Sequence, residues 1–312
     1  MIFSSMSAQL ASFADVAHYL QHQPYALPVV VLILSLLIGS FLNVVILRYP
    51  IMLFRSWLID SKDLRENLPE HSALNDLDSA YTLSKPASHC PRCQSPVKAW
   101  QNIPILSYLL LKGKCSGCAE HGKETKISIR YPLVELATGL LSLALLIKFP
   151  FSIQLAAMLV FTWSLVAMSM IDIDHQILPD TMTLSLMCLG LLLNIDHTFV
   201  DLQSAVIGAM AGYLSLWSVY WLFKLATGKD GMGFGDFKLL AALGAWFGWQ
   251  FLPMIILLSS LVGAVVGIAG IMILGRDKNI PIPFGPYLAA AGWIAAMWGN
   301  EIMEWYLPSL QA

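Results

Sequence analysis

The amino-acid sequence predicts an all-α polytopic membrane protein with about eight transmembrane helices and a small zinc-ribbon-like cytoplasmic domain between the first two. Of the 312 residues, 57% are hydrophobic and only 12% are charged, whereas soluble domains carry about 25% charged residues. One long polar segment contains four of the five cysteines. We therefore divide the chain into an N-terminal tail with the first span (1–47), a cytoplasmic cysteine-rich domain (48–130), a seven-helix membrane domain (131–306) and a C-terminal tail (307–312).

Eight apolar runs account for the predicted helices. The first ends at Arg48-Tyr49-Pro50, and the second has Pro132 at its start, where proline is favoured. The fourth and sixth runs are shorter than the ~20 residues that a span needs. In order, the predicted spans are Tyr25–Leu47, Tyr131–Leu146, Ser152–Ile171, Thr181–Ile195, Ser204–Thr227, Leu239–Trp249, Met254–Leu274 and Tyr287–Met303.

The positions of the basic residues predict the orientation. Of the 18 Lys and Arg residues, 12 lie between Arg48 and Arg130. With the N-terminus outside, the polar loops at 48–130, 172–180, 228–238 and 275–286 share the cytoplasmic side with 17 of the 18 basic residues. Such an asymmetry is typical of membrane proteins. The net charge of −2 gives no indication of a nucleic-acid partner.

The polar segment carries a candidate metal site. Two Cys-x-x-Cys pairs are separated by 21 residues, a spacing that suits a tetrahedral zinc ion held by four thiolates. Four sulfur ligands leave no open position, so the zinc would be structural. Two disulfides or four unrelated cysteines are the alternatives, and a reducing cytoplasmic face disfavours disulfides. The predicted ligands are Cys90, Cys93, Cys115 and Cys118, whereas Cys188 lies in a span and is expected to be packed.

Two aspartates are candidate catalytic residues. Asp236 follows a glycine-rich run, and Asp172 follows the third span. Both are expected on loops at the membrane boundary, where an ionisable residue is a functional candidate. Two carboxylates that share a water molecule cannot both be ionised cheaply, so one would activate the water and the other would polarise a scissile carbonyl. The alternative for Asp172 is a carboxylate that is simply solvated at a helix end.

The glycines before Asp236 are predicted to form a substrate-access loop. Gly233 and Gly235 flank Phe234, and residues without a side chain let a peptide backbone approach closely. Of the neighbouring charges, Asp180 is expected to cap the fourth span, and Lys238 to extend to the lipid surface.

Two other functions fit parts of the pattern. A proton-coupled membrane transporter also uses membrane aspartates, but it predicts carboxylates near mid-span and an inverted repeat. A zinc-ribbon scaffold without chemistry leaves the glycine loop unexplained.

Several motifs together resemble those of one enzyme family. In chain order they are Gly39-Ser40-Phe41-Leu42-Asn43-Val44-Val45 with Arg48-Tyr49-Pro50, the cysteine pairs with Asn102-Ile103-Pro104 between them, Arg130-Tyr131-Pro132-Leu133-Val134-Glu135, the Asp172 loop, Gly233-Phe234-Gly235-Asp236 and Pro283-Phe284-Gly285-Pro286. In this order the chain resembles the bacterial type IV prepilin peptidases, which are GxGD-type aspartic proteases and N-methyltransferases. The segment Ala119–Ile129 departs from the family by its length.

The resemblance implies a function and its site. Asp172 and Asp236 would be the catalytic pair that cuts the basic leader of prepilins and pseudopilins on the cytoplasmic side of the bacterial inner membrane. The enzyme would then methylate the new N-terminus with S-adenosylmethionine. Its partners would be these substrates and membrane lipid, with no nucleic acid, in type IV pilus assembly or type II secretion.

Overall fold

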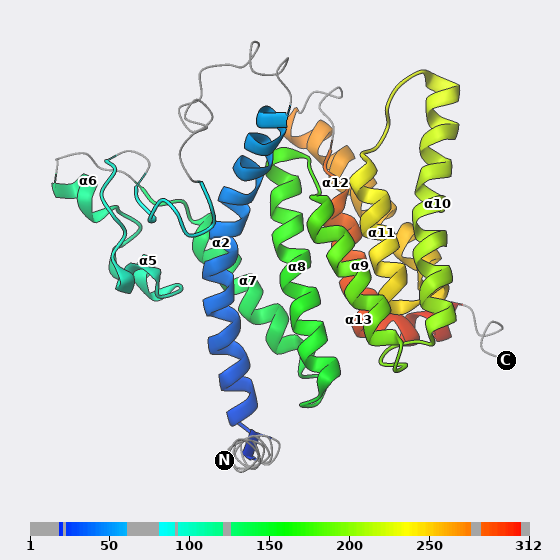
Figure 1. Cartoon of the computed structure of the whole chain (residues 1–312), viewed down its shortest axis with the longest axis horizontal. Coiled ribbons are helices and arrows are strands. Elements are labelled where there is room, and N and C mark those ends of the chain that lie inside the picture. The colour runs from blue at the N-terminus through cyan, green and yellow to red at the C-terminus, as the bar shows by residue number, and fades with distance from the viewer. Residues whose placement is uncertain are drawn as a thin grey trace. The chain divides into compact units, whose positions relative to one another are not determined.

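The computed structural model describes residues 19–20, 23–60, 81–90, 93–120, 126–275 and 282–306, and the regular elements among them are helices (Figure 1). The chain divides into two compact units, residues 1–159 and 160–312. The predicted terminal tails, except for residues close to the first helix, lie outside the described residues. So do residues 61–80 of the predicted cysteine-rich domain and residues 276–281 of the last predicted loop.

The first unit is built on two helices, α2 (Ala26–Asp60) and α7 (Arg130–Leu145). They approach closely at Gly39, because a Cβ atom there would lie only 2.9 Å from the Cα atom of Glu135. The Asn43 amide donates a hydrogen bond to the Tyr131 carbonyl at 3.1 Å. The first two predicted spans therefore pair through the motif that begins at Gly39.

The helix of the first predicted span does not end at Arg48-Tyr49-Pro50, because α2 continues through Pro50 to Asp60; the end of the span itself stays a prediction. Proline lacks one backbone donor, but the apolar residues after it favour a continued helix. The Arg48 guanidinium is held outside the helix, where it donates to the Thr82 and Leu83 carbonyls at 3.1 and 3.3 Å. At about 1.5 Å per residue, 35 residues exceed the thickness of a bilayer, so α2 projects beyond the hydrocarbon region.

The second unit contains most of α8 (Ile153–His175), followed by α9 (Asp180–Asn194), α10 (Leu202–Thr227), α11 (Phe234–Phe247), α12 (Leu252–Leu274) and α13 (Gly285–Tyr306). α11 is its core and lies between α9 and α10 (Figure 1). Trp246 is fully buried, and its indole donates to the Leu186 carbonyl of α9 at 2.8 Å. Most residues of the helix that overlaps the sixth predicted span are buried by protein.

α10 and α11 cross where both lack side chains. A Cβ atom at Gly208 would collide with the Gly244 carbonyl, and one at Gly212 would lie 2.6 Å from the Leu240 carbonyl oxygen. Gly208 and Gly212 are four residues apart and so share one face of α10. Small residues at this spacing let membrane helices pack backbone to backbone.

Eight helices of at least 14 residues in the described part of the chain overlap the eight predicted spans. Four of them are long and apolar enough to cross a membrane: α2, α8, α10 and α12 with the short turn before it. The all-helical class is confirmed, and the count of eight transmembrane helices stays a prediction. Cys188, expected to be packed, is exposed on α9.

Candidate functional site

Asp172 lies in the last turn of α8, not on the loop where it was expected. Its side chain is buried, and its Oδ2 atom accepts a hydrogen bond from the Gly285 backbone N–H at 3.0 Å. Gly285 begins α13, so the start of one helix holds a carboxylate at the end of another. A Cβ atom at Gly285 would lie 2.7 Å from this same oxygen, which leaves no room for a side chain.

Asp236 is also helical, because α11 begins at Phe234 with Gly233 as its N-cap. Its backbone N–H donates to the Gly233 carbonyl at 3.2 Å, and its side chain is only 7% exposed. The N-terminal turn of a helix is a favourable place for a carboxylate, because unpaired N–H groups point towards it. Gly235, next to Asp236, and Gly285, which contacts Asp172, both pack against Leu178. The second unit thus brings the two predicted aspartates into one buried site.

Leu178 packs between the starts of α11 and α13, next to both aspartate contacts. It belongs to the connection between α8 and α9 and is buried. A Cβ atom at Gly235 would lie 2.7 Å from the Leu178 Cβ, and a Cβ atom at Gly285 would lie 3.1 Å from its Cδ1. Both glycines therefore pack directly against this side chain.

Gly233 differs from Gly235 in its surroundings. A Cβ atom at Gly233 would meet only the Asp236 Oδ2 atom within 4 Å, at 3.7 Å, and its φ of −81° suits any residue. Gly235 has a packing role that sequence reasoning missed. The substrate-access role of Gly233 and Gly235 stays a prediction.

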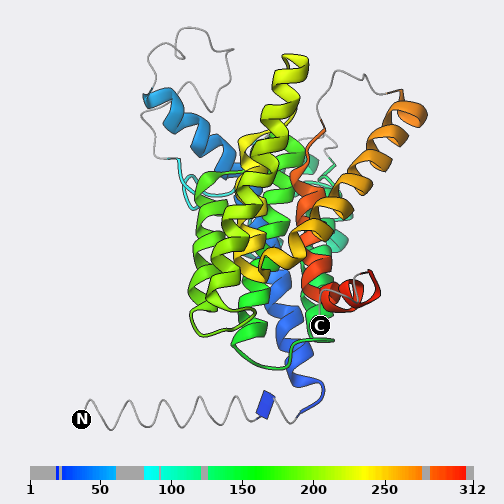
Figure 2. The same cartoon turned by 90° about the vertical axis from the view of Figure 1, so that its right-hand side faces the viewer.

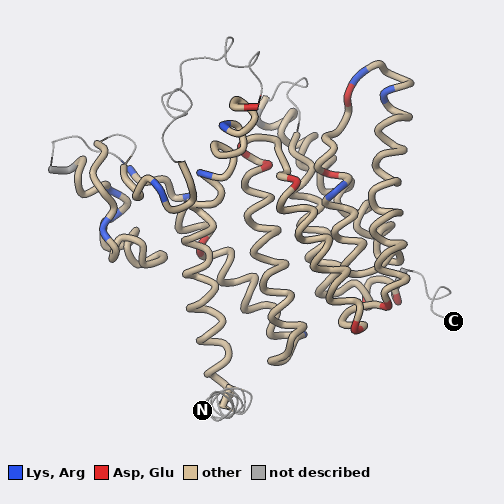
Figure 3. The backbone as a smooth tube through the Cα atoms, in the orientation of Figure 1, with Lys and Arg blue, Asp and Glu red and all other residues tan. Residues whose placement is uncertain are grey.

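Charged residues of the second unit lie near the helix ends (Figure 3). The Lys238 ammonium pairs with the exposed Asp180 carboxylate at 2.6 Å, and its extension to the lipid surface stays a prediction. Asp180 is the first residue of α9 rather than its N-cap, a position that Pro179 takes. This ion pair joins α9 to α11 two residues beyond Asp236.

A second polar cluster holds the chain that leads to α11. Asp230 accepts from the Tyr220 hydroxyl at 2.6 Å and pairs with the Lys224 ammonium at 2.8 Å. The hydrogen bond from Lys224 keeps the pKa of Asp230 below its usual range. The glycine segment is therefore tied to the end of α10.

In the first unit, the four predicted zinc ligands form a cluster. Their sulfur atoms all lie within 4.8 Å of one another, with 3.8 Å between Cys90 and Cys118 and between Cys93 and Cys115. Four sulfurs at about 2.3 Å from a tetrahedral zinc ion would be separated by about 3.8 Å. A hydrogen bond with the Ser95 hydroxyl lowers the pKa of Cys93 to about 6, which favours the thiolate. The donor set and its spacing fit a zinc ion.

Each cysteine pair is closed by one isolated β-bridge. His89 pairs with Pro96 around the first, and Lys114 pairs with Lys126 around the second. Gly117 lets the two pairs approach, because a Cβ atom there would collide with the Ser95 hydroxyl oxygen. The described residues show these bridges and short helices but no longer strands, so the zinc-ribbon comparison stays a prediction.

The segment between the cysteine pairs is attached to the two helices of its unit. The buried Glu135 carboxylate accepts from the Ile105 N–H at 2.8 Å, and the Ser40 hydroxyl donates to the Asn102 carbonyl at 3.3 Å. Sequence reasoning noted Ser40 and Glu135 only as parts of motifs. Both residues lie in predicted membrane spans, where a polar side chain needs a hydrogen-bond partner. This position was the signal that could have indicated their contacts.

Two family models match the chain. The bacterial peptidase A24 N-terminal domain covers residues 33–149, and the type IV leader peptidase family covers residues 159–268. A prepilin leader peptidase/N-methyltransferase of Stutzerimonas stutzeri is 54% identical over 289 residues, which cover 93% of this chain and 96% of the relative. Proteins with the same description are 52% identical in Pseudomonas aeruginosa, with the same coverage, and in Aeromonas hydrophila, over 96% of this chain and 99% of the relative. No solved structure gives a significant match.

Proposed function

Because the chain belongs to the bacterial type IV leader peptidase family, we propose that it cuts the leader from prepilins and pseudopilins and then methylates the new N-terminus. It is an enzyme with peptidase and N-methyltransferase activities. The observation that carries the peptidase assignment is the buried site that contains both Asp172 and Asp236. A proton-coupled transporter is supported by neither family model nor by the relatives compared above.

In the proposed cleavage, the two carboxylates share one proton. The ionised carboxylate takes a proton from water, whose oxygen attacks the scissile carbonyl carbon, while the protonated carboxylate donates a hydrogen bond to the carbonyl oxygen. When the C–N bond breaks, the leaving nitrogen takes a proton. The products are a leader with a free carboxylate and a mature chain with a free amine. The Gly285 N–H orients Asp172 by its hydrogen bond.

The mature chain's free amine is the acceptor for methylation. S-adenosylmethionine would supply the methyl group, as the methyltransferase description of the relatives implies. The pocket of the second unit that we describe below is lined mainly by apolar side chains. It therefore does not fit a charged cofactor with an adenine ring, and we assign no residue to that cofactor.

The proposal also includes a structural zinc ion and an orientation in the membrane. Cys90, Cys93, Cys115 and Cys118 would hold a structural zinc ion that stabilises the cysteine-rich domain at 48–130, between the first span and the membrane domain at 131–306. The protein would lie in the bacterial inner membrane, in contact with lipid, and its aspartates would face the cytoplasm. The predicted concentration of basic residues on one side supports this orientation.

The test of the peptidase assignment uses Asp172→Asn and Asp236→Asn. Each substitution keeps the shape of the side chain but removes a group that can take or hold the shared proton. We expect cleavage of a purified prepilin to fall by roughly a thousandfold or more in each variant, at unchanged membrane levels. Asp174→Asn is the matched control, because Asp174 is exposed on the same turn. Substantial cleavage by either test variant would contradict the paired mechanism.

A further inference from the structure

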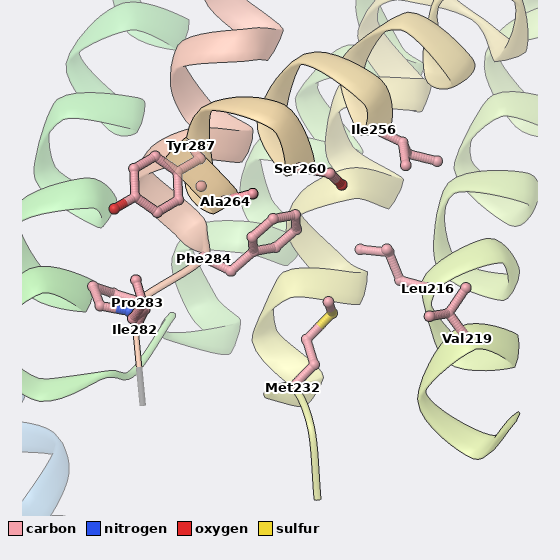
Figure 4. Close-up of a pocket in the computed structure, with 11 residues that line it drawn as sticks. Leu216, Val219, Met232, Ile256, Ser260, Ala264, Ile282, Pro283, Phe284 and Tyr287 are labelled. Carbon is pink, nitrogen blue, oxygen red and sulfur yellow. The ribbon is translucent and has the colours of Figure 1, made fainter. Parts of the chain in front are cut away.

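The second unit contains an apolar pocket of about 400 Å³ between α10, α12 and the start of α13 (Figure 4). Its size is in the range of pockets that bind small ligands or side chains. Its lining, among the described residues, has no charged side chain. Leu216 and Val219 come from α10, Ser260, Gly263 and Ala264 from α12, and Met232 and Phe284 from the segments that precede α11 and α13.

The pocket is continuous in sequence with both aspartate contacts. Met232 precedes Gly233, whose carbonyl accepts from the Asp236 N–H. Phe284 precedes Gly285, whose N–H donates to Asp172. The Phe284 carbonyl accepts from the Leu288 N–H at 3.2 Å, which fixes this residue to the first turn of α13. Two residues that line the pocket thus each precede a glycine whose backbone hydrogen-bonds to an aspartate, to the backbone N–H of Asp236 in one case and to the carboxylate of Asp172 in the other.

The helices on either side of the pocket leave a lateral approach to it. α10 packs on α11 and α12 packs on α13, and α10 and α12 diverge towards one end (Figure 2). Only 22% and 17% of the residues in their most apolar windows are buried. Val219 is 54% exposed although it lines the pocket. In a bilayer, the exposed side of this pocket would face hydrocarbon, while Met232 and Phe284 join its lining to the segments that contact the two aspartates.

We propose that this pocket receives apolar side chains of the substrate on the mature side of the bond that is cut. The inference rests on the proposed peptidase function. When a substrate reaches the aspartates from the bilayer, the apolar residues that follow its scissile bond pass α10 and α12. A substrate side chain that leaves lipid for this pocket keeps an apolar environment, whereas the polar leader has no partner there.

The first experiment locates the substrate by photocrosslinking. A benzophenone amino acid replaces Ala264 in the full chain carrying Asp236→Asn, which leaves the substrate uncut. Val265 carries the same group in the control, because it is the next residue on α12, is 59% exposed and does not line the pocket. In vesicles with full-length prepilin, we expect crosslinks from position 264 to the first few residues of the mature segment, and at least fivefold fewer from position 265.

The second experiment measures kinetics with the active enzyme. Ala264→Trp fills the pocket from α12, and Val219→Trp fills it from α10. We expect each to raise KM for prepilin by roughly tenfold, with kcat changed less than threefold. Val265→Trp and Leu222→Trp are the controls, because both positions are strongly exposed and outside the pocket. Their KM should stay within twofold of the unsubstituted enzyme.

The outcomes separate this inference from the function on which it rests. If the unsubstituted enzyme cleaves prepilin but position 264 crosslinks only phospholipid, the pocket is a lipid site and the proposal is overturned. Equal KM changes in pocket and control variants would overturn it as well. A failure of the unsubstituted enzyme to cleave any prepilin would refute the proposed function itself. If one tryptophan variant does not fold, the variant on the opposite helix gives the same measurement.

Discussion

At the scale of single residues, two glycines allow close packing around the aspartates. Gly235 and Gly285 both face Leu178, and Gly285 also faces the Asp172 carboxylate. The same absence of a side chain therefore does two things: it lets Leu178 pack between α11 and α13, and it lets a backbone N–H reach Asp172. Catalysis is sensitive to such spacing, because a shift of about 1 Å can lower a rate by on the order of a hundredfold.

Substitutions of Gly235 and Gly233 separate packing from substrate access. Gly235→Ala places a Cβ atom 2.7 Å from the Leu178 Cβ, so we expect a lower melting temperature and about a hundredfold loss of cleavage. Gly233→Ala meets no atom closer than 3.7 Å, so we expect an unchanged melting temperature. If the peptide substrate approaches at Gly233, the kcat/KM of the Gly233→Ala variant should still fall by about tenfold. Cleavage assays and thermal unfolding of both purified variants are the measurements.

Each outcome decides one role. Full activity of Gly233→Ala would remove the access role of that residue. A Gly235→Ala enzyme with unchanged melting temperature and activity would show that Leu178 can move without cost, contrary to the packing observed.

At the scale of elements, the crossing of α10 and α11 determines where Asp236 lies. α11 carries Asp236 in its first turn, and its position depends on the contacts of Gly208 with Gly244 and of Gly212 with Leu240. The ion pair between Lys238 and Asp180 adds a contact between α11 and α9. α11 is thus held on two sides.

A larger residue at this crossing should destabilise the second unit. We expect Gly208→Leu to lower the free energy of unfolding by roughly 1–3 kcal/mol through overpacking, because the Gly244 backbone fills the space. Met210→Leu is the control, since Met210 is 61% exposed on the same helix. Thermal unfolding in detergent gives the comparison. An unfolding temperature for Gly208→Leu equal to that of the control would contradict the close crossing.

The two cysteine pairs are also predicted to stabilise their part of the chain, by binding zinc. We expect purified protein to contain about one zinc ion per chain, because four sulfurs stand at tetrahedral spacing. Cys90→Ser should lose most of the metal and make residues 81–129 more sensitive to protease, since metal binding stabilises such small domains. Cys188→Ser is the matched control, because Cys188 lies outside the cluster. Elemental analysis that finds no zinc in folded protein would refute the site.

At the scale of the whole molecule, labelling from the two sides of the membrane tests the predicted orientation. The predicted topology puts the loop before α11 on the cytoplasmic side and the loop between α9 and α10 on the other side. With Cys188→Ser as background, we expect Lys229→Cys to react with an impermeant thiol reagent only in inside-out vesicles. Asp196→Cys should react only in right-side-out vesicles. Both positions are exposed and flank helices of one unit. Labelling from the same side would mean that α10 does not cross the membrane.

The sequence was sufficient to predict the helical class, the approximate positions of the eight long helices and the cluster of four cysteines. It also singled out Asp172 and Asp236, whose catalytic role stays a prediction. Each of these has a local signal: apolar runs, carboxylates at the ends of such runs, and paired cysteines. Helix ends were predicted less well. α8 runs on to His175 and α11 begins at Phe234, because a polar residue does not by itself end a helix.

Only the tertiary structure brought together what is far apart in the chain. The Gly285 N–H on Asp172 spans 113 residues, and the Lys238–Asp180 pair spans 58. A backbone donor has no residue-type signature, so no reading of Gly285 alone predicts it. Leu178 looks like any other leucine until two glycines from other helices are seen to pack against it. The apolar pocket depends likewise on how α10 and α12 diverge, a geometry that the packing of α11 and α13 decides.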